Sequence, residues 1–291
     1  MMTSDREINN KLDDELKIYR QLEPKYTRSK REVWNELETR IDQTEEEQVR
    51  IIPLRRMVLR YAVAAVLVAV LSIGLFLRLY TSSFTTARGI HSEVVLPDGS
   101  KVFLNAASTL SYHPLWWNIN REVKMNGEAF FKVTKGEKFT VISNNINTTV
   151  LGTSFNVFDR DSVIKVSCVT GSVRVSSENN QVVLKPMQQA VLDDSKQLYS
   201  KTIDDVKTIN AWIDSEFYYN SASLQKVMND IELQFDVNIS ADGDVDLSAL
   251  KYSGNYKKNH SVENVLNLVC VPFNLKYKET GKGQYNLFYD K

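Results

Sequence analysis

The stretch from Val150 to Phe158, VLGTSFNVF, places Ser154 in a turn between apolar residues, where a serine could act as a nucleophile. A nucleophile elbow has the pattern G-x-S-x-G, because small residues on both sides let the chain turn sharply and expose the hydroxyl. Here Phe155 and Asn156 follow the serine, so the second glycine is missing. The serine would also need a base, and the chain's three histidines, His91, His113 and His260, stand in no recognisable sequence context. The pattern favours a kinked strand over a catalytic site.

Carboxylates are the other residues that could do chemistry, as an acid and base pair of a tethered hydrolase. Glu128, Asp159 and Asp161 are the carboxylates embedded in the conspicuous motifs. Without a partner at a demonstrable distance, Glu128 is better interpreted as turn chemistry. The chain has no metal-ligand spacing and no glycine-rich phosphate loop ahead of a helix. We therefore predict no catalytic residue, metal or cofactor, and we expect that the protein is not an enzyme.

The two cysteines fit buried positions. Cys168 alternates with Ile164 and Val166 in a strand pattern, and Cys270 lies one turn beyond Leu266 in a helical pattern. An oxidising compartment would permit a disulfide. Both positions are more typical of small buried hydrophobic residues.

A long apolar run sets the location of everything else. From Tyr61 to Leu77 the sequence YAVAAVLVAVLSIGLFL carries no charge, and flanking residues extend the run to residues 57–80. About 20 such residues cross a bilayer as a helix, whereas buried core helices are usually shorter and secretory signal peptides begin near residue 1. The nearby basic residues are Arg50, Arg55, Arg56 and Arg60 before the run and Arg78 and Arg88 after it. The positive-inside rule then predicts a single transmembrane helix with a cytoplasmic N-terminus.

The remaining composition is balanced. The 291 residues predict about two domains, and 36 basic residues offset 36 acidic ones, so net charge gives no indication of direct nucleic-acid binding.

Residues 1–56 are expected to be helical and cytoplasmic. Apolar residues recur at three- and four-residue spacing in two stripes, of which the first is Ile8, Leu12, Leu16, Tyr19 and Leu22 and the second is Val33, Trp34, Leu37 and Ile41. Ser29 and Glu32 form a capping box at the start of the second helix. Two interpretations stand. The segment is either a loose helical hairpin or a docking segment in which a partner protein covers the apolar faces, and we favour the second.

Residues 91–200 change to period two. Short strands such as VFLNA, AFFKV, FTVIS and VIKVSCV follow one another at about 8 to 12 residue spacing, with turn residues between them. This pattern predicts an all-β domain, a sandwich or a solenoid-like fold. Residues 81–90, which include the polar stretch TSSFTTARG, are interpreted as an exposed linker.

Residues 201–291 contain an internal repeat. The segment from Ser223 to Ile239 recurs, shifted by 38 residues, from Ser261 to Tyr277. Each copy is typical of a strand, a helix capped by a serine and a second strand, and a hairpin follows. We expect an α+β module of βαβ–βαββ type, which by itself implies no chemistry.

The β-rich region resembles the FecR-type transmembrane anti-sigma factors, in the form found in Bacteroides-like bacteria. The motifs that carry the resemblance are LPDGS (Leu96 to Ser100), LN (Leu104, Asn105), REV (Arg121 to Val123), GEAFFKV (Gly127 to Val133), VLGTSFNV (Val150 to Val157), V-x-G-x-V (Val169 to Val173) and LKPMQQA (Leu184 to Ala190). The motif residues expected to be structural are Leu96, Pro97, Asp98, Gly99, Gly127, Glu128, Phe130, Gly152, Phe155, Asn156 and Gly171. Met187 stands where the family usually has glycine, so we expect a different backbone conformation in that turn.

The resemblance implies a signal relay across two membranes. The C-terminal module resembles the short N-terminal signalling domains (STN) of secretins and TonB-dependent transporters. A loaded outer-membrane TonB-dependent transporter would present its periplasmic signalling domain to this module, and the cytoplasmic segment would hold or release an extracytoplasmic-function sigma factor. The residues hypothesised to bind sigma are Leu12, Leu16, Trp34 and Leu37.

Proteolysis is the expected route of release, because a single helix transmits a conformational bias poorly. The stretch from Thr81 to Gly89 would be the outer cleavage zone, and Ser72 and Gly74 could loosen the helix for cleavage within the membrane. The alternative for these features is an ordinary linker and an ordinary helix in the inner membrane.

A membrane-anchored carbohydrate-binding module is the competing function. Tyr112, Trp116 and Trp117 could form an aromatic platform for a sugar, although an aromatic plug over the β core is the more common role of such residues. In the opening stretch, we expect Val150, Phe155 and Val157 to enter the core. Gly152 would permit a kink, Asn156 would tie the bend to neighbouring backbone, and a bulge would lie near Gly152.

Overall fold

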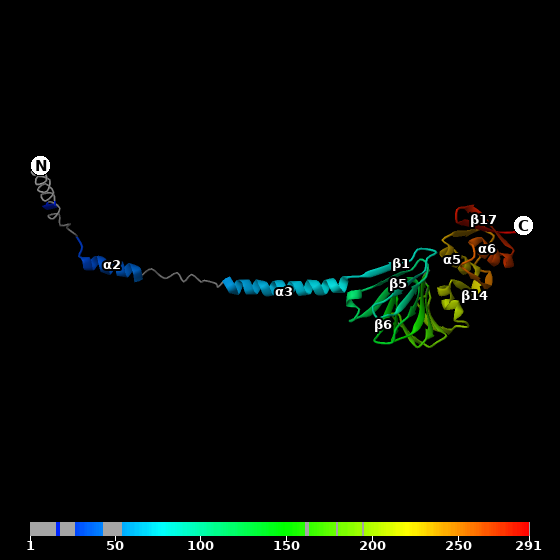
Figure 1. Ribbon diagram of the computed structural model, residues 1–291, viewed down its shortest axis with the longest axis horizontal. Helices are drawn as coiled ribbons and strands as arrows, with labels where there is room; N and C mark the ends of the chain where they lie inside the picture. Colours follow the sequence, from blue (N-terminus) through cyan, green and yellow to red (C-terminus); the bar gives the residue numbers. More distant parts are fainter. Residues whose placement is uncertain are drawn as a thin grey trace, which may run out of the picture. The chain divides into compact units, whose positions relative to one another are not determined.

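The computed structural model describes residues 16–17, 27–42, 54–160, 163–178, 180–193 and 195–290 (Figure 1). The residues of the sequence predictions that lie outside these ranges are Ile8, Leu12, Tyr19, Leu22, Arg50 and Asp161. The chain divides into two compact units, Met1–Ala65 and Val66–Lys291, which we describe separately.

The first unit contains helix α2 (Lys30–Asp42). The predicted capping box is confirmed, since the Ser29 amide donates to the Glu32 carboxylate at 2.9 Å and the Glu32 amide donates to the Ser29 hydroxyl at 3.3 Å. The apolar stripe along α2 consists of Val33, Trp34, Leu37 and Ile41, and all four side chains are exposed. Leu16 is exposed as well. The described part of this unit therefore presents an apolar helix face that nothing covers.

Helix α3 (Leu54–Leu79) contains the apolar run, and 23 of its residues, Met57–Leu79, are long and apolar enough to cross a membrane. Tyr61 and Leu77 both lie within this span. None of the span is buried against the rest of the described chain. A core helix of a soluble protein would be mostly buried, so this exposure fits a helix surrounded by lipid.

A β-rich domain follows α3 directly (Figure 1). Its strands are β1 (Ser82–Thr85), β2 (Ser92–Val95), β3 (Lys101–Leu104), β4 (Thr109–Tyr112), β5 (Arg121–Lys132), β6 (Phe139–Ser143), β7 (Ile146–Val150), β8 (Ser154–Arg160), β9 (Val163–Thr170), β10 (Val173–Ser176), β11 (Gln181–Leu184), β12 (Gln188–Leu192) and β13 (Leu198–Thr202). The strands form one continuous sheet in the order β11-β10-β7-β6-β5-β8-β9-β12-β13, with β1-β4 and β2-β3 branching from β5. The sheet bends back on itself and is nearly a barrel, so the solenoid alternative is wrong.

Strand β5 connects the two layers into which this sheet folds, because its two halves pair with different strands. Its first half pairs with β4 and β6, and its second half pairs with β3 and β8. The change of layer falls at Gly127, where φ is 96° and an added Cβ would lie 2.6 Å from the Ser108 hydroxyl oxygen. Only glycine fits this crossing without displacement of a neighbour.

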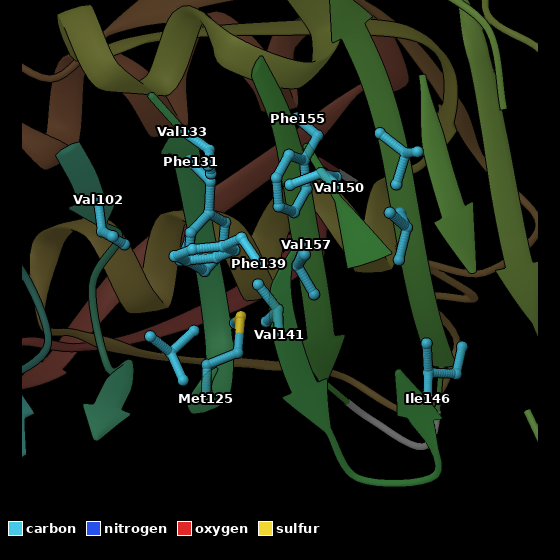
Figure 2. Close-up of a cluster of buried hydrophobic side chains, with 14 of the residues drawn as sticks. Val102, Met125, Phe131, Val133, Phe139, Val141, Ile146, Val150, Phe155 and Val157 are labelled. Carbon is cyan, nitrogen blue, oxygen red and sulfur yellow. The ribbon is translucent and has the colours of Figure 1, made fainter. Parts of the chain in front are cut away.

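The core fills the space between the two layers (Figure 2). Phe131 and Phe155 stack with their ring centroids 5.0 Å apart, and Phe139 meets Phe131 edge-on at 6.2 Å. Tyr112 and Trp117 close one end of the core, with Trp117 packed edge-on against Phe139. Both of these side chains are buried, so they form the aromatic plug and not an open sugar platform.

The stretch VLGTSFNVF forms the end of β7, a turn and most of β8. Val150, Phe155 and Val157 are buried as expected. An added Cβ at Gly152 would lie 2.7 Å from the Lys135 Cα, so this glycine lets two backbone segments approach closely. A bulge is present, but the pairing between β8 and β9 shifts at Ser154 and Phe155 and not at the glycine.

Residues 81–90 differ from the predicted linker. Ser82–Thr85 pair with β4 as strand β1, and the Thr86 hydroxyl, which is buried, donates to the carbonyls of Asn105 and Ser108 at 2.6 and 3.1 Å. Thr86 therefore satisfies backbone groups of the neighbouring loop, whereas Thr81, Ser83 and Thr85 are exposed, as predicted.

The turn at Met187 also differs from expectation. Met187 has a φ of 66°, in the left-handed region that glycine adopts easily and other residues enter at a cost. Two backbone hydrogen bonds hold this geometry, from the Met187 amide to the Cys168 carbonyl and from the Ile203 amide to the Met187 carbonyl. The turn therefore keeps a backbone suited to glycine, and our prediction of a changed conformation is wrong.

The C-terminal elements follow strand β13, so the expected boundary at residue 200 falls inside a strand. They are α4 (Lys207–Asn210), η2 (Ala211–Asp214), β14 (Glu216–Ser223), α5 (Leu224–Phe235), β15 (Asn238–Ala241), β16 (Lys251–Lys257), α6 (Val262–Cys270), η3 (Val271–Phe273), β17 (Leu275–Gly281) and β18 (Gln284–Tyr289). We call them the C-terminal module. Ser223 and Ser261 cap α5 and α6 through their side chains. Strands β14 and β16 pair with each other, and β15, β18 and β17 form a second small sheet.

Candidate functional site

The outer face of the β-rich domain carries a row of side chains that lies across five strands. The register places Phe103 opposite Phe130, Phe130 opposite Asn156, Asn156 opposite Ser167, and Ser167 opposite Gln189. Directly paired residues point to the same face of a sheet. Phe103 and Phe130 belong to the same hydrophobic cluster as the core of the C-terminal module, so the module covers the apolar end of the row.

Glu128 occupies the junction between the sheet and the module. Its carboxylate accepts hydrogen bonds from the Asn105 amide at 2.8 Å and from the Asn156 amide at 2.9 Å. Burial raises the pKa of Glu128 above its usual range, and the two amides and the nearby Arg160 oppose that shift. Glu128 lies within strand β5, so our interpretation of it as turn chemistry is wrong. Asn156 bonds this carboxylate and not the neighbouring backbone.

A chain of donors links Glu128 to the C-terminal module. The Asn105 side chain that donates to Glu128 accepts from the Gln234 amide at 2.8 Å, and the Gln234 carbonyl lies 2.7 Å from His91 Nε2. A carboxylate only accepts, so the side-chain NH2 group of Asn105 points to Glu128 and that of Gln234 points to Asn105. The side-chain oxygen of Gln234 then faces His91, which therefore donates through Nε2. Burial is the main cause that lowers the pKa of His91, and nearby Lys258 lowers it further.

Residues 81–91 cross this junction, and we call them the strap. The Arg88 guanidinium donates to the carbonyls of Glu232 and Val237 at 2.9 and 2.5 Å, at the C-terminal end of α5. The Gly89 amide donates to the Leu233 carbonyl at 2.8 Å, and the Lys258 ammonium donates to the Gly89 carbonyl. Helix ends leave carbonyls without partners and attract positive charge. The module thus binds the segment that leaves α3.

A cavity of about 420 Å³ lies beside the junction. Phe158, Lys165, Gln189 and Lys226 are among its lining residues. Lys226 pairs with Asp230 at 2.6 Å. The same carboxylate accepts from the Tyr219 hydroxyl at 3.1 Å. The wall on the module side is therefore a polar network anchored on helix α5.

This arrangement does not match a hydrolase. Glu128 pairs with Phe158 across the sheet, so Asp159, the next residue, points to the opposite face, and the two carboxylates cannot act on one substrate. Within the described part of the chain, no hydrogen bond joins the Ser154 hydroxyl to a histidine, and no group of three His, Cys, Asp or Glu residues could hold a metal ion. Cys168 and Cys270 are both free and buried, in two different cores.

The other motif residues have structural roles. Asp98 in the LPDGS turn accepts from the Ser100 amide at 2.9 Å and pairs with the Arg121 guanidinium. Burial alone would raise the pKa of Asp98, but the hydrogen bonds from Arg121 and Ser100 lower it below its usual range. Leu96 and Phe155 are core residues. An added Cβ at Gly171 would lie 2.6 Å from the Thr153 methyl group, so this glycine is required by close packing.

Three contributors to the junction, Arg88, Gln234 and Lys226, were missed from the sequence. Arg88 and its partners Glu232, Val237 and Asn238, on and just after α5, are separated by 144 to 150 residues. No short motif joins positions so far apart. The one signal in the sequence is that Arg88 is a basic residue close after the apolar run.

The fold and the sequence of the chain match a class of signal-transduction proteins. Residues 82–174 match the FecR protein family and residues 216–285 match the FecR C-terminal family. The two matches together span more than half of the chain. The protein is a member of the FecR family of anti-sigma factors. No curated protein matches it closely enough for comparison.

Solved structures agree with this assignment. Two crystal structures, at 2.50 and 1.65 Å resolution, come from Parabacteroides distasonis ATCC 8503 and are described as proposed anti-sigma factors. Each is 29% identical to this chain with a TM-score of 0.66. The matches cover 73% and 72% of this chain and 100% of the crystallised chains. The likeness supports a role in signal transduction that involves a sigma factor.

Proposed function

We propose that the protein is a single-pass inner-membrane regulator that relays a signal from an outer-membrane TonB-dependent transporter to a cytoplasmic extracytoplasmic-function sigma factor. In this proposal α3 spans the membrane, residues 1–56 are cytoplasmic and residues 81–291 are periplasmic. The relay needs no catalytic activity of the chain itself and no cofactor. Cleavage by separate proteases releases the sigma factor.

The observation that carries the proposal is the attachment of the strap to the C-terminal module. Arg88 and Gly89, which follow the end of α3 at Leu79 by nine and ten residues, bond the end of α5. Strand β1 is paired within the sheet, and a paired strand is a poor protease substrate because cleavage requires local opening. A partner that displaces the module would break the bonds of Arg88 and Gly89 and expose the part of the strap that follows β1.

The signalling partner would dock on the module. We propose that the module is STN-like and that it accepts a strand from the transporter's signalling domain. Among the described strands, β14 and β16 pair only with each other, so each leaves one edge with unpaired backbone groups. Edges of this kind accept a partner strand.

The sigma factor would bind the uncovered face of the cytoplasmic segment. Trp34 and Leu37 lie on the exposed stripe of α2, and an amphipathic helix with one exposed apolar face commonly docks in a groove of a partner. Four arginines before the apolar run, against two after it, support the cytoplasmic location of this segment.

The test separates the two ends of the relay. Residues 1–56 should co-purify with the cognate sigma factor, and Trp34→Ala together with Leu37→Ala should abolish the complex, whereas Thr39→Ala on the same helix should not. Deletion of residues 217–291 should remove the response to the transporter's ligand and leave sigma binding intact. A fragment 1–56 that binds no sigma factor would refute the proposal, as would an unchanged response of the deletion.

A carbohydrate-binding function has no support from the geometry of the aromatic residues. Tyr112 and Trp117 face the core, so they cannot stack on a sugar. Of the three predicted platform residues Trp116 alone is partly exposed, and a single ring does not make the predicted platform. We therefore set this alternative aside.

A further inference from the structure

The loop between β4 and β5 carries an apolar surface beside the end of α3. Residues 113–120, HPLWWNIN, contain no acidic residue, lysine or arginine. Leu115 is half exposed and Ile119 is 70% exposed, and Tyr80 at the end of α3 is also exposed. Trp116 lies between them and is partly exposed. We call Tyr80, Leu115, Trp116 and Ile119 the juxtamembrane patch.

Hydrogen bonds hold the loop against the helix end. His113 Nδ1 lies 3.2 Å from the Tyr80 carbonyl oxygen and 3.1 Å from the Thr81 hydroxyl oxygen. These contacts place the loop at the level where α3 ends. The headgroup layer on each side of the hydrocarbon core is about 5–8 Å thick, so a loop bonded to Tyr80 lies within it.

The loop is also rigid. The turn η1 (Pro114–Trp116) begins with a backbone bond from the Trp116 amide to the His113 carbonyl, and the amides of Ile119 and Asn120 both donate to the Trp116 carbonyl. Trp117 anchors the loop from the inside through its buried ring. The exposed side chains are therefore held outward, and their exposure is not a result of a loose loop.

We propose that the juxtamembrane patch docks the β-rich domain on the lipid headgroup and acyl boundary of the membrane that α3 spans. Tryptophan and tyrosine are enriched at this boundary because their rings combine an apolar body with a polar end. Large apolar side chains gathered on a surface mark an interaction site, and the continuity of the patch with Tyr80 identifies the membrane as its partner. The contact fixes the orientation of the domain and shields the start of the strap.

The inference rests on the proposed membrane span of α3, and the experiment tests the two separately. Three variants of the full chain that each add one cysteine, Ile119→Cys, Val271→Cys and Leu67→Cys, carry a small fluorophore on that cysteine in phosphatidylcholine vesicles. Val271 in the C-terminal module is the matched control, because it is β-branched and 71% exposed. Cys168 and Cys270 are buried, and burial raises their pKa to about 11 and about 12, so the native thiols will not compete for the label.

Lipids with a quencher near the headgroup should quench the label at Ile119 several-fold more than the label at Val271, as expected for a side chain about 5–10 Å into the boundary. Lipids with a deep quencher should quench the label at Leu67. Equal quenching at Ile119 and Val271, with Leu67 quenched, would overturn the docking of the patch and leave the membrane span intact. An unquenched Leu67 would overturn the span and the patch together.

Discussion

Replacement of Arg88 by alanine should open the strap. The substitution removes the donors to the carbonyls of Glu232 and Val237 and a third bond, of 3.1 Å, to the Asn238 side chain. A hydrogen bond to a charged group contributes about 1.5–3 kcal/mol when it is buried. The Arg88 side chain is about one-third exposed, so water replaces part of the loss. We expect that the free energy of strap opening falls by about 2 kcal/mol, on the scale of one such bond.

A change of that size raises the open population of the strap about 30-fold, since about 1.4 kcal/mol is a factor of ten. Hydrogen exchange of the full chain should detect it at the Gly89 amide, and a protease should cut the part of the strap that follows β1, residues 86–91, faster when opening and closing are rapid relative to cleavage. In cells, transcription from the sigma-dependent promoter should rise without the inducing ligand.

Two control variants define the result. Arg88→Lys keeps the charge near the end of α5 but loses the planar fork that reaches two carbonyls at once, so its exchange rate should be intermediate. Arg174→Ala removes an exposed arginine side chain on β10 that forms no ion pair or hydrogen bond among the described residues, and it should leave exchange at Gly89 unchanged. Exchange at Gly89 that is identical in the native protein and in Arg88→Ala would refute the reasoning.

Three further predictions concern single positions. Gly152→Ala should lower the free energy of unfolding by about 1–3 kcal/mol because of the close approach to Lys135. Gly243→Ala, with open space around it, should change the free energy of unfolding by less than about 0.5 kcal/mol. Denaturant titration of both variants measures this difference. Met187→Gly should raise the unfolding free energy by up to about 1 kcal/mol, since the relief of a left-handed residue exceeds the entropy cost of glycine, and a lower denaturation midpoint would contradict this strain. The pKa of His91 is lowered in the folded state, so the unfolded state binds the proton first as the pH falls below about 6.5, and the native protein loses stability there. Because the glutamine of His91→Gln does not titrate, the melting temperature of this variant relative to that of the native protein should rise as the pH falls. A difference in melting temperature that stays constant with pH would rule out this linkage.

The β-rich domain could be predicted because its signals are local. Alternation placed Val150, Phe155 and Val157 in the core, and the serine caps of α5 and α6 depend on residues three positions apart. The strap could not be predicted in this way. Its polar residues are typical of a linker, and they are structured only because β4 and the C-terminal module supply partners from distant parts of the sequence.

Glu128 illustrates the same limit at the candidate site. Its motif marked the position correctly, but the motif does not reveal that Asn105, Asn156 and, through Asn105, Gln234 converge there. Those contacts depend on strand register and on the packing of α5, which no short motif encodes. The sequence could therefore identify the residue but not its partners.

The position of the strap bears on how a signal could pass through a single helix. A rigid helix such as α3 would need two stable arrangements to carry a conformational signal, and each would require different contacts. The strap offers a simpler route in the proposed mechanism, because the module's bonds to Arg88 and Gly89 lie nine and ten residues after the helix end. Loss of those bonds changes which peptide bonds a protease can reach, and α3 itself need not move. Cleavage then makes the response irreversible, so even a brief displacement of the module is sufficient.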